Sequence, residues 1–156
     1  MGRNAARRAA RFRLPFQPAV NTPELIDFYH QECERVGFDN PVAIPPGPGT
    51  MITVSEDPDR TWAEIGRYLL HDATTYASWQ PENHRSTVHS DANTVEALRA
   101  EGKHRVLTPD ECVEYAKSQG ALAAISLFPL CGGTPPDLAW PSLELYASKV
   151  LPRLRG

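Results

Sequence analysis

The chain has 156 residues, of which 41% are hydrophobic and 22% are charged. It is long enough for one domain with its own apolar core, and its composition excludes wholesale disorder. The formal net charge of -3 argues against a general nucleic-acid binder. No apolar run approaches the ~20 residues that cross a bilayer, and no apolar stretch follows the N-terminal arginines as it would in a secretory signal.

The cysteine pattern predicts a cytoplasmic protein. Cys33, Cys112 and Cys131 are odd in number and widely spaced, which fits reduced thiols better than a disulfide framework or a zinc site. For Cys131 a buried, inert thiol is favoured over a reactive one. The histidines form no metal-ligand pair with an acid between them on one helix face, so we predict no metal site.

The first third of the sequence predicts two helices separated by a weak strand. A short helix follows Asn4, whose side chain is a candidate cap, and it has alanines on one side and arginines on the other. Residues 13–17, RLPFQ, are a weak strand because their proline cannot donate to a ladder. Thr22 and Pro23 then cap and open a second helix, which Gly37 ends.

The middle of the sequence predicts a connector, a strand and a long helix. Residues 39–49 are rich in proline and glycine and have no helical periodicity. Residues 50–55, TMITVS, are short and β-branched, as strands are. Asp57 and Pro58 start a helix whose apolar residues recur every three or four positions as far as Trp79.

Residues 80–105 are predicted to be a surface insertion. The segment is polar and irregular as far as Asp91. Val95 and Leu98 then mark a short helix, which Gly102 ends.

The last third predicts a capped helix, a buried strand and a closing helix. Thr108 and Glu111 have the spacing of a capping box. Residues 121–130 form a nearly continuous apolar run, typical of a strand covered on both faces, and residues 131–136 form a glycine–proline turn. We expect Pro141 in the first turn of the closing helix, or at a kink after a short first turn.

The alternation of helices and strands predicts an α/β fold with a parallel sheet and right-handed crossovers. In such folds the loops at the carboxyl ends of the strands are where ligands bind.

Three segments, taken in order, form a recognisable set. GRNAARRAARF joins a glycine turn to a helix, and TVSEDPDRTWAEIGRYLLHDATTYASWQ is a strand–helix unit. VLTPDECVEYAKSQGALAAISLFPLCGGTPPDLAWPSLELYASKVLPRL has a "TP-E" helix, a strand, a "PL-GG-PP" turn and a helix ending "KVLP-L". The set resembles the C-terminal end of the luciferase-like (LLM class) flavin-dependent monooxygenases, in which the first segment reads "GG-[ST]-AARRAAR".

The resemblance implies that residues 1–156 are a partial luciferase-like monooxygenase domain, the C-terminal part of a (β/α)8 TIM barrel. A full barrel takes roughly 250 residues. We therefore expect an incomplete barrel without its N-terminal strands. Three explanations are open for such a chain: a gene fragment, a truncated gene model, or a chain that needs a partner. The family binds FMN, or in some branches the deazaflavin F420, and uses reduced flavin and molecular oxygen to oxidise an organic substrate.

The same resemblance sets the expected partners: a flavin, a small organic substrate, and either a flavin reductase or the missing N-terminal half. Nucleic acid and membrane are not among them. An incomplete parallel sheet has an open edge and an exposed apolar face, which predicts self-association into a homo-oligomer.

Five residues are candidates for cofactor binding by their match to the family. Gly2, Arg3 and Asn4 match its phosphate-binding turn, where backbone amides and the helix dipole attract phosphate. The alternative is a frayed N-terminus with Asn4 as an ordinary cap. Gly132 and Gly133 are candidate contacts of flavin or substrate, although a tight turn that only glycine can make is the favoured explanation.

Other functions stay open. The nearest alternative is an F420-dependent dehydrogenase of the same superfamily, and the alternative from another class is a non-catalytic remnant or interaction module. The arginine run near the N-terminus could bind a polyanion, but the solvated outer face of a barrel helix explains it better. No catalytic residue is identified.

Overall fold

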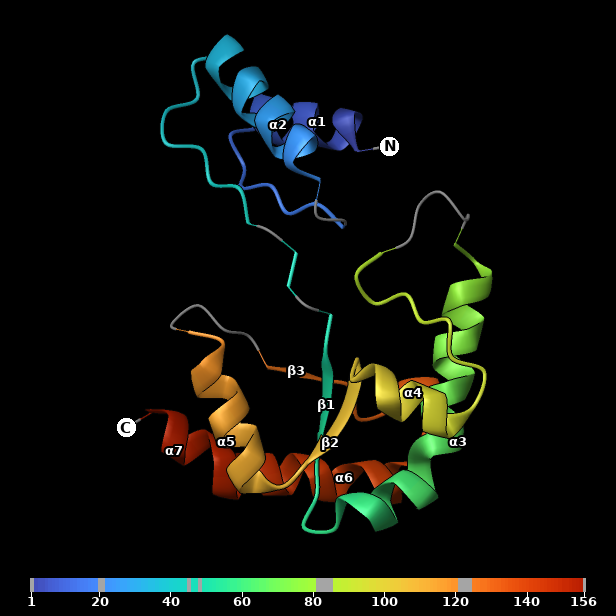
Figure 1. The fold of residues 1–156 in the computed structure, drawn as a ribbon. Helices are drawn as coiled ribbons and strands as arrows, with labels where there is room; N and C mark the ends of the chain where they lie inside the picture. Colours follow the sequence, from blue (N-terminus) through green and yellow to red (C-terminus); the bar gives the residue numbers. More distant parts are fainter. Residues whose placement is uncertain are drawn as a thin grey trace. The chain divides into compact units, whose positions relative to one another are not determined.

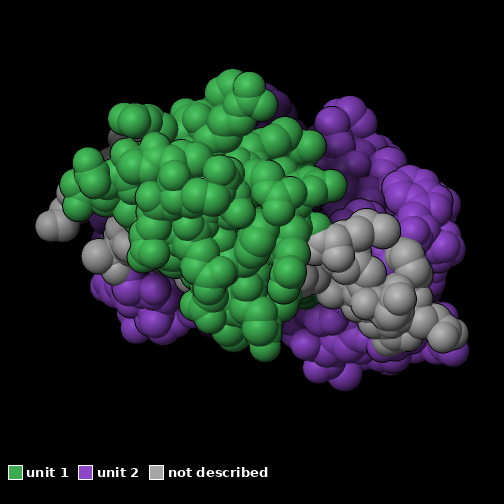
Figure 2. All heavy atoms as spheres, turned by 90° about the horizontal axis from the view of Figure 1, so that it is seen from above, with its two compact units in different colours: residues 1–49, 84–87 green, residues 50–83, 88–156 purple. Residues whose placement is uncertain are grey.

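The computed structural model describes residues 2–19, 22–44, 46, 47, 49–80, 86–120 and 125–155 (Figure 1). The chain divides into two compact units (Figure 2). Unit 1 comprises Met1–Gly49 and His84–Thr87, and unit 2 comprises Thr50–Asn83 and Val88–Gly156. The fold is α/β, because unit 2 contains a small open parallel sheet with helices around it.

Unit 1 is built on two helices, α1 (Arg3–Arg11) and α2 (Pro23–Arg35), as the sequence predicts. Ala6 and Ala10 are completely buried and let the two helices pack closely. The predicted cap at Asn4 is wrong. The helix begins two residues earlier than predicted, with Gly2 at the cap position, so Asn4 lies inside the first turn.

The weak strand predicted at 13–17 is reduced to a single parallel bridge between Phe16 and Ala43. Phe16 N–H donates to the carbonyl of Val42 at 3.0 Å, and the N–H of Ile44 donates to the carbonyl of Phe16 at 2.9 Å. The next residues on this edge of the segment are Leu14 and Pro18. Pro18 has no N–H to donate, and the N–H of Leu14 donates to the carbonyl of Ala9 at 2.9 Å, so the ladder does not extend from Phe16 in either direction.

Tyr29 fills the centre of unit 1. Its ring stacks on Phe16 with 5.3 Å between ring centroids, and its hydroxyl donates to the carbonyl of Leu14 at 2.9 Å. Burial is the main cause that raises the pKa of Tyr29 to about 12, so the phenol keeps its proton and its hydrogen bond at neutral pH.

Both helices of unit 1 end in a left-handed residue. Gly37 (φ 63°) ends α2 as predicted, and the next N–H, of Phe38, donates to the carbonyl of Cys33 at 2.9 Å. Arg13 (φ 55°) occupies the same position after α1, where Leu14 N–H donates back into the last turn. An arginine therefore holds a backbone conformation that favours glycine.

The sheet of unit 2 has three parallel strands in the order β2-β1-β3 (Figure 1). β1 (Met51–Val54) confirms the strand predicted at 50–55. β2 (His104–Leu107) was not predicted, because it has only four residues, two of them polar. β3 (Ser126–Leu127) lies within the strand predicted at 121–130, of which residues 121–124 are outside the described residues.

Four longer helices surround the sheet, and three of them begin at a proline. They are α3 (Pro58–Ser78), α4 (Val95–Glu101), α5 (Pro109–Ser118) and α6 (Pro136–Leu145), followed by a π-helical turn (Tyr146–Val150) and α7 (Leu151–Arg155). Asp57 caps α3 by accepting from the N–H of Arg60 at 3.1 Å. The capping box predicted at Thr108 and Glu111 is confirmed in both directions.

Pro141 is not in the first turn of its helix. It is the sixth residue of α6, which continues through it and loosens into the π-helical turn. The helix starts at Pro136, earlier than expected, because Pro135 and Pro136 already provide its fixed entry geometry. Because proline has no N–H, Pro141 removes one backbone hydrogen bond from the interior of α6.

Two apolar cores lie on the two faces of the sheet. One contains Trp62, Ile65, Leu69, Ala73, Ala92, Leu98, Val106 and Cys131, mainly from α3 and α4, and the other contains Ile52, Val54, Leu107, Cys112, Val113 and Val150. Residues on β2 contribute to both cores. The expectation of a strand covered on both faces at 121–130 is wrong for its described part, because Ser126, Phe128 and Leu130 are exposed and Leu127 is only half-buried. Ala92 and Leu98 come from the segment predicted to be a surface insertion. Among the described residues, no helix combines the length and apolar character that a bilayer span requires.

His104, at the start of β2, is a buried polar residue with only 4% of its surface exposed. Burial lowers the pKa of His104 below its ordinary 6.5, while the carboxylates of Asp72 and Glu101 act in the opposite direction. The unfolded chain therefore binds a proton at this histidine at a higher pH than the folded chain does.

We expect the stability of unit 2 to fall as the pH drops below about 6.5, because only the unfolded state then protonates His104 readily. The His104→Gln variant should show a flatter dependence between about pH 7 and pH 5. Urea unfolding followed by tryptophan fluorescence measures this, since all three tryptophans lie in unit 2. His71→Gln, at an exposed position, is the control; an equal flattening there would contradict the assignment.

Replacing Arg13 by glycine should stabilise unit 1 by about 0.5–1 kcal/mol, because glycine adopts the left-handed conformation without strain. The matched variant Arg8→Gly, inside α1, should destabilise it by about 1 kcal/mol. Hydrogen exchange of the α1 amides reports both changes. Faster exchange in Arg13→Gly would disprove the strain.

Candidate functional site

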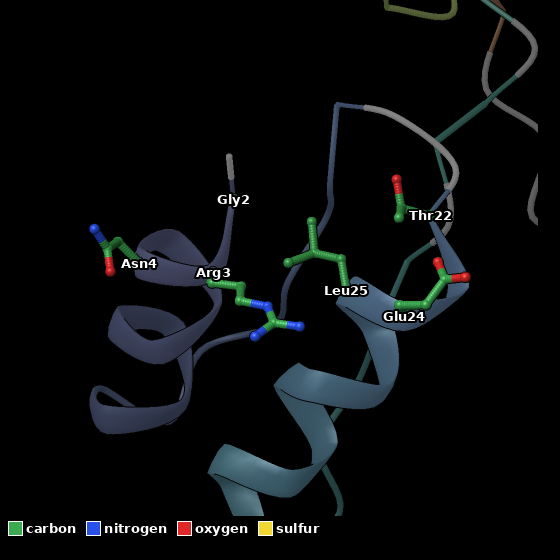
Figure 3. Close-up of a pocket in the computed structure, with 6 residues that line it drawn as sticks. All are labelled: Gly2, Arg3, Asn4, Thr22, Glu24 and Leu25. Atoms are coloured by element: carbon green, nitrogen blue, oxygen red, sulfur yellow. The ribbon is translucent and has the colours of Figure 1, made fainter. Parts of the chain in front are cut away.

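The predicted phosphate-turn residues lie together at a pocket in unit 1 (Figure 3). The pocket has a volume of about 400 Å³ and lies at the first turns of α1 and α2. Its lining residues are Gly2, Arg3 and Asn4 from the start of α1, and Thr22, Glu24 and Leu25 from the start of α2. Such a volume falls in the range of small-ligand sites.

Backbone amides at the start of α1 are available to a ligand. At the start of α2, Pro23 has no N–H and the N–H of Leu25 donates to the carbonyl of Thr22 at 2.9 Å. In α1 the first hydrogen bond runs from the N–H of Ala6 to the carbonyl of Gly2 at 2.9 Å, so the earlier amides have no acceptor within the helix. Neither Gly2 nor Thr22 provides a side-chain cap to its helix. Free amides and the positive ends of two helix dipoles favour an anion.

The glycine at position 2 is required by both its backbone and its neighbour. Its φ is 106°, a value that other residues rarely adopt. A Cβ there would lie 2.6 Å from Cδ2 of Leu25. The absence of a side chain thus lets the start of α1 approach α2 closely enough to form the pocket.

The side chains at the pocket give it a mixed charge. Figure 3 shows Arg3 extending from α1 toward α2, while the amide of Asn4 points away from α2. The guanidinium of Arg3 lies over the ring of Phe28, 5.0 Å from its centroid, and has no ion pair among the described residues. Its charge is therefore available to an anion, whereas the carboxylate of Glu24 on the opposite wall opposes one.

A second arginine of α1, Arg7, already has an acidic partner on α2. Arg7 lies 3.5 Å from Glu32, which also binds Arg35 at 2.9 Å. The Arg35 guanidinium is the main cause that lowers the pKa of Glu32. None of these three residues lines the pocket, so Arg3 supplies the positive side chain of the site.

The sequence did not reveal the contribution of α2. Thr22, Glu24 and Leu25 belong to a threonine–proline–acid helix start, which is a signal for a cap and not for a ligand. Only the packing of α1 on α2 brings this start to the phosphate turn.

Gly132 and Gly133 lie in unit 2, in a 3₁₀ turn (Cys131–Gly133) between β3 and α6. Both have positive φ, 60° and 81°. A Cβ on Gly132 would lie 1.9 Å from the carbonyl oxygen of Tyr68, so this glycine is required where the turn packs on α3. A Cβ on Gly133 meets nothing within 4 Å, which leaves this residue open to a ligand.

Cys131 is buried beside these glycines. Burial first, and the nearby Asp72 carboxylate second, raise the pKa of Cys131 to about 12. The thiol therefore stays protonated at neutral pH, as expected for an inert cysteine. Among the described residues no three histidine, cysteine, aspartate or glutamate side chains are grouped so as to hold a metal ion.

Comparison of the chain with family models and with curated proteins identified no relative. No protein-family model matches the chain, and a search of curated proteins found no significant match.

The two turn glycines should respond differently to alanine. Gly132→Ala should lower the free energy of unfolding of unit 2 by about 3 kcal/mol or more, because its Cβ collides with the backbone of α3. Gly133→Ala should cost only about 1 kcal/mol, from its positive φ alone. Urea unfolding followed by tryptophan fluorescence compares the two, and similar losses would rule out the packing role of Gly132.

Proposed function

We propose that the chain is part of a flavin-dependent oxidoreductase, a monooxygenase of the luciferase-like family, and that the pocket of unit 1 holds the phosphate of FMN. The observation that supports this most is that Gly2, Arg3 and Asn4, matched to the family's phosphate turn from sequence, line one pocket. The deazaflavin F420, which also carries phosphate, is the alternative cofactor of the same site, and an F420-dependent dehydrogenase is then the activity.

The residues of the pocket fit a phosphate group by their chemistry. The unpaired amides at the start of α1 donate to phosphate oxygens, and Arg3 adds a charge-assisted hydrogen bond. Gly2 keeps the backbone accessible. The carboxylate of Glu24 favours a ligand that also presents hydroxyl groups, as the ribityl chain next to a flavin phosphate does.

The sheet is consistent with a place in a (β/α)8 barrel. β1 and β3 are parallel neighbours, and each is followed by a turn and a helix, as barrel strands are. We propose that these are barrel strands, that β2 is an addition to them, and that the remaining strands come from outside this sequence. Gly133, open to a ligand after β3, is then a contact for the flavin or its substrate.

A bound flavin would supply the electron transfer in this proposal, and the chain's residues would bind and orient it. Reduced flavin would come from a separate reductase, and the substrate would be a small organic molecule. We place this activity in the cytoplasm, where the three cysteines stay reduced.

Fluorescence titration of the full chain with FMN and with riboflavin tests the phosphate site. We expect saturable binding of FMN, which Arg3→Ala should weaken about tenfold by removing one charge-assisted hydrogen bond. Riboflavin has no phosphate, so its binding should be weaker and should not respond to Arg3→Ala. F420 is titrated in parallel to choose between the cofactors.

Arg8→Ala is the matched control, since Arg8 is an exposed arginine of the same helix outside the pocket. An equal loss of FMN affinity in both variants would show nonspecific attraction to the basic helix. If neither flavin binds the folded chain, the proposed site is wrong.

A further inference from the structure

A second pocket lies entirely within unit 2, at the carboxyl end of β1, and we call it the β1-end groove. Its volume is about 360 Å³. The walls come from the end of β1 and the turn after it, from the first turns of α3, and from α6: Thr53, Val54, Ser55, Glu56, Asp57, Arg60, Thr61, Glu64, Asp137, Leu138, Pro141, Ser142 and Leu145.

The groove occupies the place where parallel sheets bind ligands. β1 is the central strand, with β2 on one side and β3 on the other. After β1 the chain forms β2 on one side of it, and then crosses to the other side of β1 to form β3. Crevices outside the carboxyl ends of strands at such a reversal of strand order are the usual ligand sites of open α/β sheets.

The groove carries a net negative charge. Four carboxylates line it, on Glu56, Asp57, Glu64 and Asp137. Arg60 neutralises Glu64 at 2.9 Å, and Lys149 pairs with Glu56. Asp57 and Asp137 have no ion pair among the described residues, but the Asp57 carboxylate already caps α3 by accepting from the N–H of Arg60. Asp137 is therefore the carboxylate most available to a cation in the groove.

A buried hydroxyl with an unused proton lies in the same wall. Ser142 is 7% exposed and accepts from the N–H of Val54 at 2.7 Å. The hydroxyls of Thr74 and Ser148 donate to carbonyls one turn earlier in their helices, but Ser142 donates to no acceptor among the described residues. A buried donor without an acceptor is unfavourable, and a ligand oxygen would satisfy it.

The apolar part of the wall adjoins this hydroxyl. Leu138 and Leu145 line the groove on the same helix. Ser142, Leu138 and Thr53 also border a small cavity of about 10 Å³, which Ile65, Leu69 and Phe128 line as well. The groove thus presents carboxylates, a free hydroxyl proton and carbon surface to one ligand.

We propose that the β1-end groove binds a small organic cation that carries a protonated amine and a hydroxyl or carbonyl oxygen. The amine lies at Asp137, the oxygen accepts from Ser142, and the carbon chain between them packs on Leu138 and Leu145. This site is independent of the flavin proposal, since none of its residues belongs to unit 1.

Isothermal titration of the full chain with 4-amino-1-butanol tests the proposal. We expect saturable binding, at least about threefold weaker binding of butan-1-amine, which lacks the oxygen, and none of 4-hydroxybutanoate, which has the opposite charge. No binding of the amino alcohol to the folded chain, or equal binding of 4-hydroxybutanoate, would overturn it.

The Asp137→Asn variant locates the binding. Asp137 is exposed, so its replacement leaves the fold intact and should weaken the amino alcohol about tenfold. Asp39→Asn, an exposed aspartate of unit 1, should have no effect. Unchanged affinity in Asp137→Asn, or an equal loss in Asp39→Asn, would place the ligand elsewhere and refute the assignment.

Discussion

The hydrogen bond from the N–H of Val54 to the hydroxyl of Ser142 links the sheet of unit 2 to its closing helix. Successive residues of β1 bond alternately to the two neighbouring strands, and Ser55 N–H, for example, donates to β2 at Leu107. Val54 therefore points toward β3. β3 reaches no further along β1 than the pair of Ile52 and Leu127, so the strand offers Val54 no acceptor. The hydroxyl of α6 replaces the missing strand.

This replacement also explains the groove. Because β3 ends early, the chain turns at Cys131–Gly133 and places the start of α6 beside the end of β1, where a longer strand would have continued the sheet. Gly132 makes the turn possible by lying against the backbone of α3. The space at the carboxyl end of β1 is thus enclosed by polar helix starts and one serine, and not by apolar strand residues. A short strand and a tight turn together produce a surface suited to a ligand.

Local signals in the sequence predicted local structure well. The capping box at Thr108 and the left-handed end at Gly37 depend on residues a few positions apart, and both are confirmed. β2 was missed because its pairing with β1 depends on a partner about fifty residues away, and its own four residues show no strand pattern. The same limit applies to sites. Sequence resemblance indicated Gly2, but the contribution of Glu24 and the role of Ser142 arise from tertiary packing alone.

The strand order β2-β1-β3 differs from the order in a (β/α)8 barrel. In a barrel wound in sequence order, each strand pairs with the next one along the chain, and β2 would lie between β1 and β3. Here β1 is paired on both edges, to β2 and to β3, so no further strand can be added beside it. If β1 and β3 are consecutive barrel strands and β2 is an addition, β2 occupies the edge of β1 at which the preceding barrel strand would pair. An intact barrel would therefore require β2 to leave that edge, and a further strand could otherwise join the barrel strands only at the outer edge of β3.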